Sequence, residues 1–373
     1  MVARTLASLG LAALLGCAGA ESGPPAPAAA PPPSRSFAMG FTDFPHAFSS
    51  EAIAFAMSVV ERDGDLAIAH WDDGVPWQEA LSGATYAPGF QAEIARRQAG
   101  FPPGHVLYLA LTPIAFERDR LAAHKGDTGG EPLRPPWNAR SFDHPEVIAA
   151  FLAHCERMLA AFRPRYFAYA IEANLLARIE PREWPAFVSL AAAIYPRLKA
   201  THPELPIFLT LQADTFHEQR EIQADLVRQV LPFTDVIAVS SYPFSAEADP
   251  ERLRADHFSA LRELAPAKPF AVSETCWPAE PVSAPYPAFI PASEQAQRRY
   301  VERLLGDAER LDAVFVSWFF PRDFDDFWDS HIRLLPNAPL LRLWKDCGLY
   351  AGDGRERPGL GVWRDWLARR RAG

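Results

Sequence analysis

The chain has 373 residues, a formal net charge of −9 at pH 7 and an isoelectric point of about 5.6. This acidic balance argues against a nucleic-acid partner, because phosphate binding relies on clustered lysines and arginines. The length allows a large buried core, in one large domain or two small ones.

The N-terminal segment, residues 1–16, is typical of an export signal. It carries a positive charge at Arg4 and then a short apolar run that ends directly before Cys17. Such a run is too short to cross a bilayer, which favours a signal peptide. The Leu-Leu-Gly-Cys ending resembles a bacterial lipobox, which implies that Cys17 is acylated and becomes the first residue of the mature protein. The alternative is an ordinary signal peptide with an accidental cysteine.

The following residues, 17–36, predict a tether. After Cys17 they are rich in Ala, Pro, Ser and Gly and include a Pro-Pro-Pro run, a composition that cannot build a core. We therefore expect a signal peptide at 1–16, a lipidated cysteine and tether at 17–36, and one folded domain at 37–373. The protein would be exported and held in the bacterial cell envelope by its lipid alone. Ala18 favours the outer membrane if the cell is Gram-negative.

Eight short apolar runs predict strands, and helical patterns lie between most of them. The runs are almost wholly apolar rather than alternating, as in strands that are buried on both faces. Eight strands, each followed by a helix or a long loop, predict a single (β/α)8 TIM barrel of the α/β class. A doubly wound open sheet is the alternative, and the absence of G-x-G-x-x-G after the first run weakens it. The runs are Phe37–Phe41, Leu66–His70, Val106–Leu111, Tyr166–Ile171, Ile207–Leu211, Val236–Ser240, Phe270–Ser273 and Ala313–Phe319.

Two glutamates stand at the ends of such runs, Glu172 after YFAYAI and Glu274 after PFAVS. In a barrel all strand ends meet at one mouth, where barrel enzymes carry their active sites. An ionisable group there is costly to bury and has little structural use, and paired carboxylates are the groups that carry out glycoside hydrolysis. The structural alternative is that each glutamate pairs with an arginine of the barrel mouth.

Other residues near the predicted strand ends suit a sugar site. Acids and amides hydrogen-bond hydroxyl groups, and indole faces stack on the apolar faces of pyranose rings. Structural alternatives exist, since Asp72 lies just before Gly74 and suits a turn, and the tryptophans could pack in a lid or in the core. The expected substrate-binding residues are Asp72, Trp77, Asn174, Gln212, Tyr242, Trp277 and Trp318.

Three segments resemble the clan A retaining glycoside hydrolases, a superfamily of TIM-barrel glycosidases. Ser-Glu-Thr-Cys-Trp-Pro around Glu274 is similar to the segment of the strand-seven nucleophile, and Glu-Ala-Asn at 172–174 is similar to the strand-four acid/base segment. The ending W-x-x-x-G-L from Trp344, followed by D-G and Trp363, resembles that of the endo-β-1,4-galactanase-like members.

The resemblance implies a retaining, two-step reaction on a β-linked oligo- or polysaccharide. Glu274 would attack the anomeric carbon, and Glu172 would first donate a proton and then activate water, with the carboxyl groups roughly 5 to 5.5 Å apart. Tyr242 could hydrogen-bond Glu274, hold it ionised and orient it. The expected partner is a carbohydrate. No cofactor or metal is expected, since the sequence carries neither H-E-x-x-H nor G-x-x-x-x-G-K.

A second hypothesis is a surface lipoprotein that binds glycans without hydrolysing them. Two departures from the superfamily pattern favour it. Ile171 stands where an asparagine usually contacts the sugar 2-hydroxyl, and His70-Trp71 occupies the region of the usual arginine at the end of strand two. The two glutamates disfavour it, because a binding module gains little from two nearby like charges. No spacing selects a disulfide pair among the remaining cysteines, Cys155, Cys276 and Cys347.

Overall fold

The computed structural model describes residues 34–283, 289–335 and 338–372, which belong to one compact unit, Ser34–Gly373. The expected signal peptide, Cys17 and the tether up to residue 33 lie outside the described residues, so their assignments stay predictions. Within the described residues, no helix is both long enough and apolar enough to cross a membrane.

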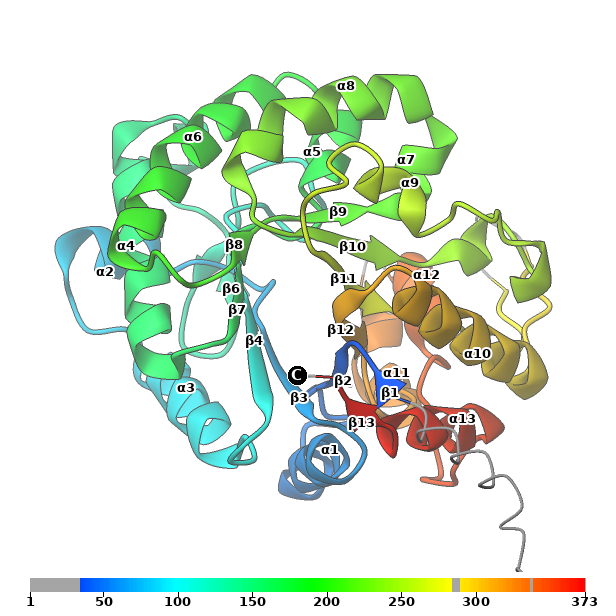
Figure 1. Ribbon diagram of the computed structural model, residues 1–373. Helices are drawn as coiled ribbons and strands as arrows, with labels where there is room; N and C mark the ends of the chain where they lie inside the picture. Colours follow the sequence, from blue (N-terminus) through cyan, green and yellow to red (C-terminus); the bar gives the residue numbers. More distant parts are fainter. Residues whose placement is uncertain (1–33, 284–288, 336–337, 373) are drawn as a thin grey trace, which may run out of the picture. The chain divides into compact units, whose positions relative to one another are not determined.

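All eight expected strands are present and form a parallel barrel, which confirms the predicted TIM barrel (Figure 1). The fifth expected run is divided at Leu209 into two short strands. Its first half pairs with the strand before it and its second half with the strand after it, so this run closes the barrel. The barrel strands are β2 (Ala38–Thr42), β3 (Leu66–His70), β4 (Val106–Ala110), β7 (Tyr166–Ala168), β8 (Ile207–Phe208), β9 (Thr210–Gln212), β10 (Ile237–Ser241), β11 (Phe270–Thr275) and β12 (Ala313–Trp318). Their order is β8-β7-β4-β3-β2-β12-β11-β10-β9. The other strands are β1 (Ser34–Arg35), β5 (His124–Lys125), β6 (Gly130–Glu131) and β13 (Arg370–Arg371).

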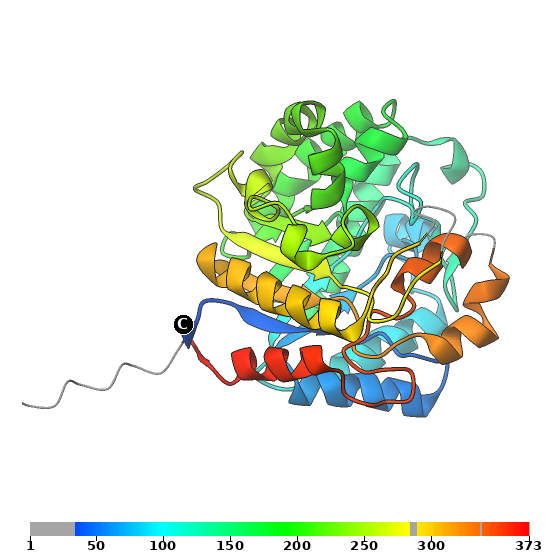
Figure 2. The ribbon, with the colours of Figure 1, turned by 90° about the vertical axis from the view of Figure 1, so that its right-hand side faces the viewer.

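Helices surround the barrel and cover the outer face of its strands (Figure 1). The α-helices are α1 (Ser50–Arg62), α2 (Trp77–Ser82), α3 (Pro88–Gly100), α4 (Pro145–Phe162), α5 (Ala173–Ile179), α6 (Trp184–Thr201), α7 (Ala213–Glu218), α8 (Arg220–Val230), α9 (Ser259–Arg262), α10 (Glu294–Arg310), α11 (Asp325–Ser330), α12 (Ala338–Leu341) and α13 (Pro358–Leu367). The 3₁₀ helices are η1 (Trp137–Ala139), η2 (Leu231–Phe233), η3 (Pro243–Ser245), η4 (Pro250–Arg252), η5 (Ile332–Leu334) and η6 (Arg342–Trp344). Figure 2 shows α10 and α13 side by side on one flank.

Local sequence signals set the ends of the longer helices. The Ser49 hydroxyl accepts a hydrogen bond from the Ala52 N–H at the start of α1, and Ser293 accepts one from Ala296 at the start of α10. Both helices carry a glutamate in the first turn and an arginine in the last. These charges complement the helix dipole, so both helix boundaries follow from sequence.

The barrel strands are buried on both faces, as their apolar runs predicted. Side chains that point into the barrel form one hydrophobic cluster, and those that point outward pack against the helices. Ile171 belongs to the inner cluster together with Tyr108, Phe208 and Phe315, and it is 1 % exposed. Its apolar side chain therefore has a packing role in the barrel interior.

The folded unit begins at Ser34 rather than at the expected boundary, Phe37. β1 pairs in parallel with β13, so the two ends of the unit lie together (Figure 2). Arg35 is buried, and its guanidinium forms an ion pair with Asp65 at 2.8 Å. The sequence did not predict β1, because the composition around it is that of a tether and its pairing partner, β13, lies at the far end of the chain.

Candidate active site

Glu172 and Glu274 both lie at the carboxyl ends of barrel strands. Glu172 stands between β7 and α5 with a left-handed backbone, φ 50°, and its N–H donates a hydrogen bond to Thr210 Oγ1 at 2.8 Å. Such a backbone is costly for a non-glycine residue unless its surroundings hold it, so the Thr210 contact helps to position Glu172. Glu274 is the second-last residue of β11. Each glutamate side chain is 10 % exposed.

Arg118 reaches Glu172 from the loop between β4 and α4. Its Nε and Nη2 atoms donate hydrogen bonds to Glu172 Oε2 at 3.3 and 3.1 Å. Nη1 and Nη2 also donate to the two carboxylate oxygens of Asp72, at 2.9 and 2.7 Å. Ser240 Oγ donates to the other Glu172 oxygen, Oε1, at 2.7 Å. Glu172 is therefore held at both carboxylate oxygens.

The site thus contains a guanidinium although the expected arginine of strand two is missing. For Glu172 the structural alternative, pairing with an arginine, is realised. Asp72 binds Arg118 with both oxygens, so in this structure it positions the arginine rather than a sugar hydroxyl. The sequence did not reveal this arrangement because Arg118 lies 46 positions after Asp72, on a loop without a motif.

Tyr242 and His70 flank Glu274. The Tyr242 hydroxyl donates a hydrogen bond to Glu274 Oε1, as predicted, and His70 Nδ1 lies 3.8 Å from Oε2. Burial lowers the pKa of His70 to about 3, and the charge of Arg118 contributes, so the imidazole is neutral. Burial raises the pKa of the Glu274 carboxyl well above its usual range, and the charge on Glu172 raises it further. The hydrogen bond from Tyr242 lowers this pKa but does not cancel the shift.

The buried carboxyl group of Asp214 lies next to the backbone of Tyr242. Asp214 Oδ2 accepts a hydrogen bond from the Tyr242 N–H at 2.6 Å, and Oδ1 lies 3.5 Å from Ser241 Oγ. Ser241 Oγ also hydrogen-bonds His257 Nε2 at 2.7 Å. Burial raises the pKa of Asp214 to about 7; the bond from Tyr242 opposes the shift, and the charge on Glu172 adds to it.

We expect Asp214→Asn to flatten the pH dependence of stability between about pH 4 and 7. The folded pKa of about 7 exceeds the ordinary value of 3.8, so the stability that this proton contributes is present at acid pH. It is lost as the pH rises through 7, at up to about 1.4 kcal/mol per pH unit. Urea unfolding across this range measures the slope. Asp225→Asn, at a side chain that is 79 % exposed, is the control, and a wild-type slope in Asp214→Asn would contradict the assignment.

The three tryptophans predicted as sugar platforms are core residues. Trp77, Trp277 and Trp318 are each 0 % exposed, so no ring face is free to stack on a sugar and this prediction is wrong. Trp77 Nε1 donates to the Ala122 carbonyl at 2.9 Å, and Trp318 Nε1 donates to the Cys347 carbonyl at 3.0 Å. A position near a strand end does not say whether an indole turns toward the mouth or toward the packed layers around it.

Asn174 and Gln212 join the start of α5 to the end of β9. Asn174 is 0 % exposed; its Nδ2 donates to the Gln212 carbonyl at 3.0 Å and to Gln223 Oε1 at 2.9 Å. Its Oδ1 accepts from the Gln212 N–H at 2.7 Å. Gln212 Oε1 accepts from the Thr215 N–H at 2.7 Å and caps α7. The prediction of substrate binding is therefore wrong for Asn174, and the Gln212 oxygen is committed to the helix cap.

Half-buried aromatic rings surround Tyr242. Trp344, in η6, packs edge-on against the Tyr242 ring with centroids 5.3 Å apart, and Phe319 packs against the same ring at 6.0 Å. Phe44 contacts both Phe319 and His70, at 5.6 and 5.7 Å. Unlike the three buried tryptophans, Trp344, Phe319 and Phe44 are partly exposed. In the sequence, Trp344 is marked only by the W-x-x-x-G-L motif, and Phe319 and Phe44 carry no signal beyond following a strand.

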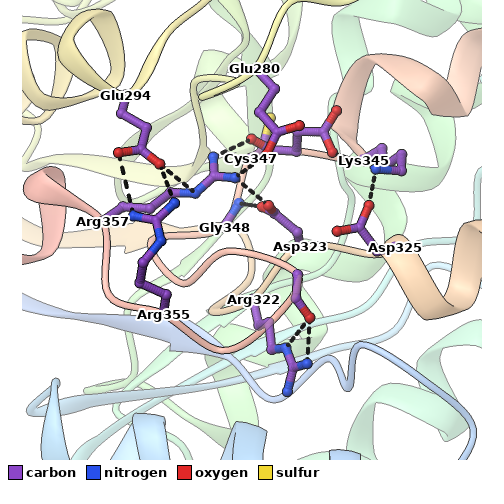
Figure 3. Close-up of polar contacts among 12 residues, drawn as sticks. Glu280, Glu294, Arg322, Asp323, Asp325, Lys345, Cys347, Gly348, Arg355 and Arg357 are labelled. Atoms are coloured by element: carbon purple, nitrogen blue, oxygen red, sulfur yellow. Dashed lines mark hydrogen bonds and ion pairs between the residues drawn. The ribbon is translucent and has the colours of Figure 1, made fainter.

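A cluster of carboxylates near the closing segment, residues 344–349, is already neutralised by cationic side chains. Oxygen atoms of Glu280, Asp323 and Asp346 lie within 4.8 Å of one another, a spacing that a metal ion could use. Arg357 lies among them, with Nη2 2.5 Å from Asp323 and 2.9 Å from Glu280 (Figure 3). Lys345 pairs with Asp346 at 2.7 Å. These ion pairs anchor the chain around the cluster and leave its carboxylates partnered.

A cavity of about 760 Å³ lies between α1 and α13, and neither glutamate lines it. Arg62 and Arg364 line it, and both are paired with the buried carboxylate of Asp63, at 3.0 and 2.7 Å. Its charged groups are therefore satisfied by one another, and the two glutamates remain the stronger candidate site.

Comparisons with known proteins bear on the fold. No protein-family model and no curated protein sequence matches the chain. Among solved structures, GH5_18 from Streptomyces cattleya in complex with GlcNAc has a TM-score of 0.65 and 16 % identity, covering 91 % of this chain and 83 % of that one. The exo-β-1,4-mannosidase Op5Man5 from Opitutaceae bacterium strain TAV5 has a TM-score of 0.62 and 13 % identity, covering 89 % and 59 %. Xylanase 10B from Thermotoga maritima has a TM-score of 0.52 and 10 % identity, covering 89 % and 95 %. The chain therefore has the TIM-barrel fold of glycoside hydrolases.

Proposed function

We propose that the protein is a retaining glycoside hydrolase that acts on a β-linked oligo- or polysaccharide. The observation that carries this proposal is the pair of largely buried carboxyl groups, Glu172 and Glu274, at two strand ends of one barrel. Each has its own hydroxyl donor, Ser240 for Glu172 and Tyr242 for Glu274. The charge on Glu172 raises the pKa of Glu274, which supports a coupled pair.

A double displacement requires a protonated acid and an ionised nucleophile. Glu172 is ion-paired with Arg118 in this structure, so the mechanism requires this contact to loosen when Glu172 takes up the proton that it gives to the leaving group. Tyr242 continues to donate to Glu274 Oε1 and stabilises the carboxylate that forms.

In the reaction the two glutamates have separate roles. Glu274 forms a bond to the anomeric carbon while Glu172 gives its proton to the leaving oxygen. In the second step Glu172 takes a proton from water, and the water oxygen displaces Glu274. The product then keeps the anomeric configuration of the substrate.

The similar structures support a carbohydrate partner. GH5_18 from Streptomyces cattleya is bound to GlcNAc, and a variant of it is bound to Manb1-4GlcNAc. The mannosidase is an exo-β-1,4 enzyme by name. The closing motif adds β-1,4-galactan to the substrates that deserve testing. A panel of β-linked polysaccharides and aryl glycosides, with reducing-end release as the readout, tests the proposal; no release from any substrate would contradict it.

We expect Trp344→Ala to weaken glycan binding by about 1 kcal/mol, roughly a fivefold increase in Kd. Trp344 is partly exposed beside Tyr242, so part of its side chain is accessible to a sugar that enters next to Glu274. Calorimetric titration of a catalytically inactive background protein, with and without the Trp344 substitution, against the best substrate measures the change in Kd. Trp366→Ala is the matched control, because Trp366 is also partly exposed but stacks on Phe37. Equal affinity in all three proteins would remove Trp344 from the site.

A glycan-binding lipoprotein without activity is the second candidate. The ion pair between Arg118 and Glu172 favours it, because it engages one oxygen of the acid that must protonate the substrate. If the folded protein binds a glycan but does not hydrolyse it, the non-catalytic binding function is supported.

We also propose that the protein is exported and lipid-anchored through Cys17. The proposal rests on the apolar run before Cys17 and the Pro-rich segment after it. Incorporation of labelled fatty acid into the wild-type protein and its loss in Cys17→Ser test the anchor. Unlabelled wild-type protein would contradict it.

A further inference from the structure

Two buried cysteines lie on neighbouring segments next to the candidate active site. Cys276 directly follows β11, two positions after Glu274, and Cys347 lies in the closing segment, residues 344–349. Both side chains are free thiols and 0 % exposed.

Hydrogen bonds show that these segments run side by side. The Ala279 N–H donates to the Asp346 carbonyl at 2.8 Å. One nitrogen, Gln297 Nε2, donates to the carbonyls of Trp277 and Gly348, at 2.9 and 3.0 Å. Trp277 and Gly348 are the residues that directly follow the two cysteines, so the backbone holds the cysteines next to each other.

The two thiols also influence each other. Burial raises the pKa of Cys276 well above its usual range, and the neighbouring thiol of Cys347 raises it further. Burial likewise raises the pKa of Cys347. Because the thiolate is the reactive form and neither sulfur is accessible, oxidation of the folded protein is slow. A bond between these sulfurs therefore has to form while the chain folds.

We propose that Cys276 and Cys347 form a disulfide bond when the chain folds in an oxidising compartment. The proposal uses the predicted export of the chain, because disulfides persist outside the cytosol. A thiolate of the pair attacks a disulfide oxidant of low molecular mass or of an oxidoreductase and releases one thiol. The second cysteine then attacks the mixed disulfide and releases the other thiol. The protein loses two protons and two electrons, and the oxidant is reduced to two thiols.

The disulfide would fix the closing segment to the strand that carries Glu274. Polar contacts already hold this segment, since the Gly348 N–H donates to Asp323 Oδ1 at 2.8 Å and Arg357 pairs with Asp323 (Figure 3). Trp344, on the same segment, packs on Tyr242. If the proposed function holds, the bond would keep this ring in place beside the reacting groups.

Peptide mapping of the full chain tests the bond without any use of activity. The protein is refolded with oxidised glutathione, alkylated under denaturing conditions without reduction, and digested. We expect a linked peptide pair that contains Cys276 and Cys347, and its disappearance after reduction. Cys155, buried in α4, should be alkylated. Alkylation of both Cys276 and Cys347, or a link of either to Cys155 or Cys17, would overturn the proposal.

Thermal unfolding with and without reductant provides a second measurement. We expect reduction to lower the Tm of the wild-type protein by roughly 3 to 6 °C, because the bond constrains a long loop. Cys155→Ser should keep this difference, whereas Cys276→Ser and Cys347→Ser should lose it. A reductant effect that survives in both of these variants would contradict the pairing. Neither readout involves a glycan, so an inactive protein would leave the result intact.

Discussion

Glu274→Gln is expected to lower turnover on the order of 10⁴-fold or more, the scale of loss when a nucleophile is removed. The amide has nearly the volume of the acid but no charge with which to attack the anomeric carbon. The fold should survive, because Tyr242 can donate its hydrogen bond to the amide oxygen as it does to the carboxyl group. Steady-state kinetics on an aryl glycoside, with circular dichroism to verify folding, measures the effect.

The stereochemistry of the product separates the roles of the two glutamates. Early NMR spectra should show retained anomeric configuration, and a fluorosugar should be trapped on Glu274. Glu172→Gln is the comparison variant: it should lose less activity on substrates with good leaving groups, because these need no proton in the first step. An inverted product would defeat the covalent mechanism, and a sugar trapped on Glu172 would reverse the roles.

Arg118→Met is expected to destabilise the protein by about 3 to 5 kcal/mol, the typical result of breaking a buried ion pair. The change leaves Asp72 and Glu172, whose side chains are 13 % and 10 % exposed, without the cation that binds both. The loss should therefore exceed that of an ordinary surface substitution, and urea unfolding at neutral pH measures it.

A neighbouring arginine offers a matched control. Arg120 lies on the same turn but is 62 % exposed, and it pairs with Glu117 and Asp119. Arg120→Met should change stability by less than about 1 kcal/mol. Adding Glu172→Gln to Arg118→Met should restore part of the loss, because one of the unpaired charges is removed. Equal effects of the two arginine substitutions would show that Arg118 is not the centre of a buried network.

The fold could be predicted because its signals are local. Each barrel strand is a short apolar run, and runs such as Phe270–Ser273 are apolar because both faces of the strand are buried. Once the eight strands close, Glu172 and Glu274 must share one mouth. The hydrogen bond from Tyr242 to Glu274 also followed, because neighbouring strands place these residues side by side.

The partners of the site residues could not be predicted, because they come from distant segments. Arg118 meets Asp72 and Glu172 across 46 and 54 positions, and its loop has no pattern that marks it. The exposure of the tryptophans could not be predicted either. Trp318 and Trp344 have the same chemistry, yet the first is fully buried and the second is partly exposed beside Tyr242.

The amino-acid sequence by itself determined the barrel and the positions of its two carboxylates, because strands that are buried on both faces appear in the sequence as short apolar runs. Tertiary structure alone decided the direction of each side chain and the charge balance of the site. Side-chain direction and charge balance depend on which loops meet at the mouth of the barrel. The residues that meet there are far apart in the chain, and no regular spacing in the sequence marks them.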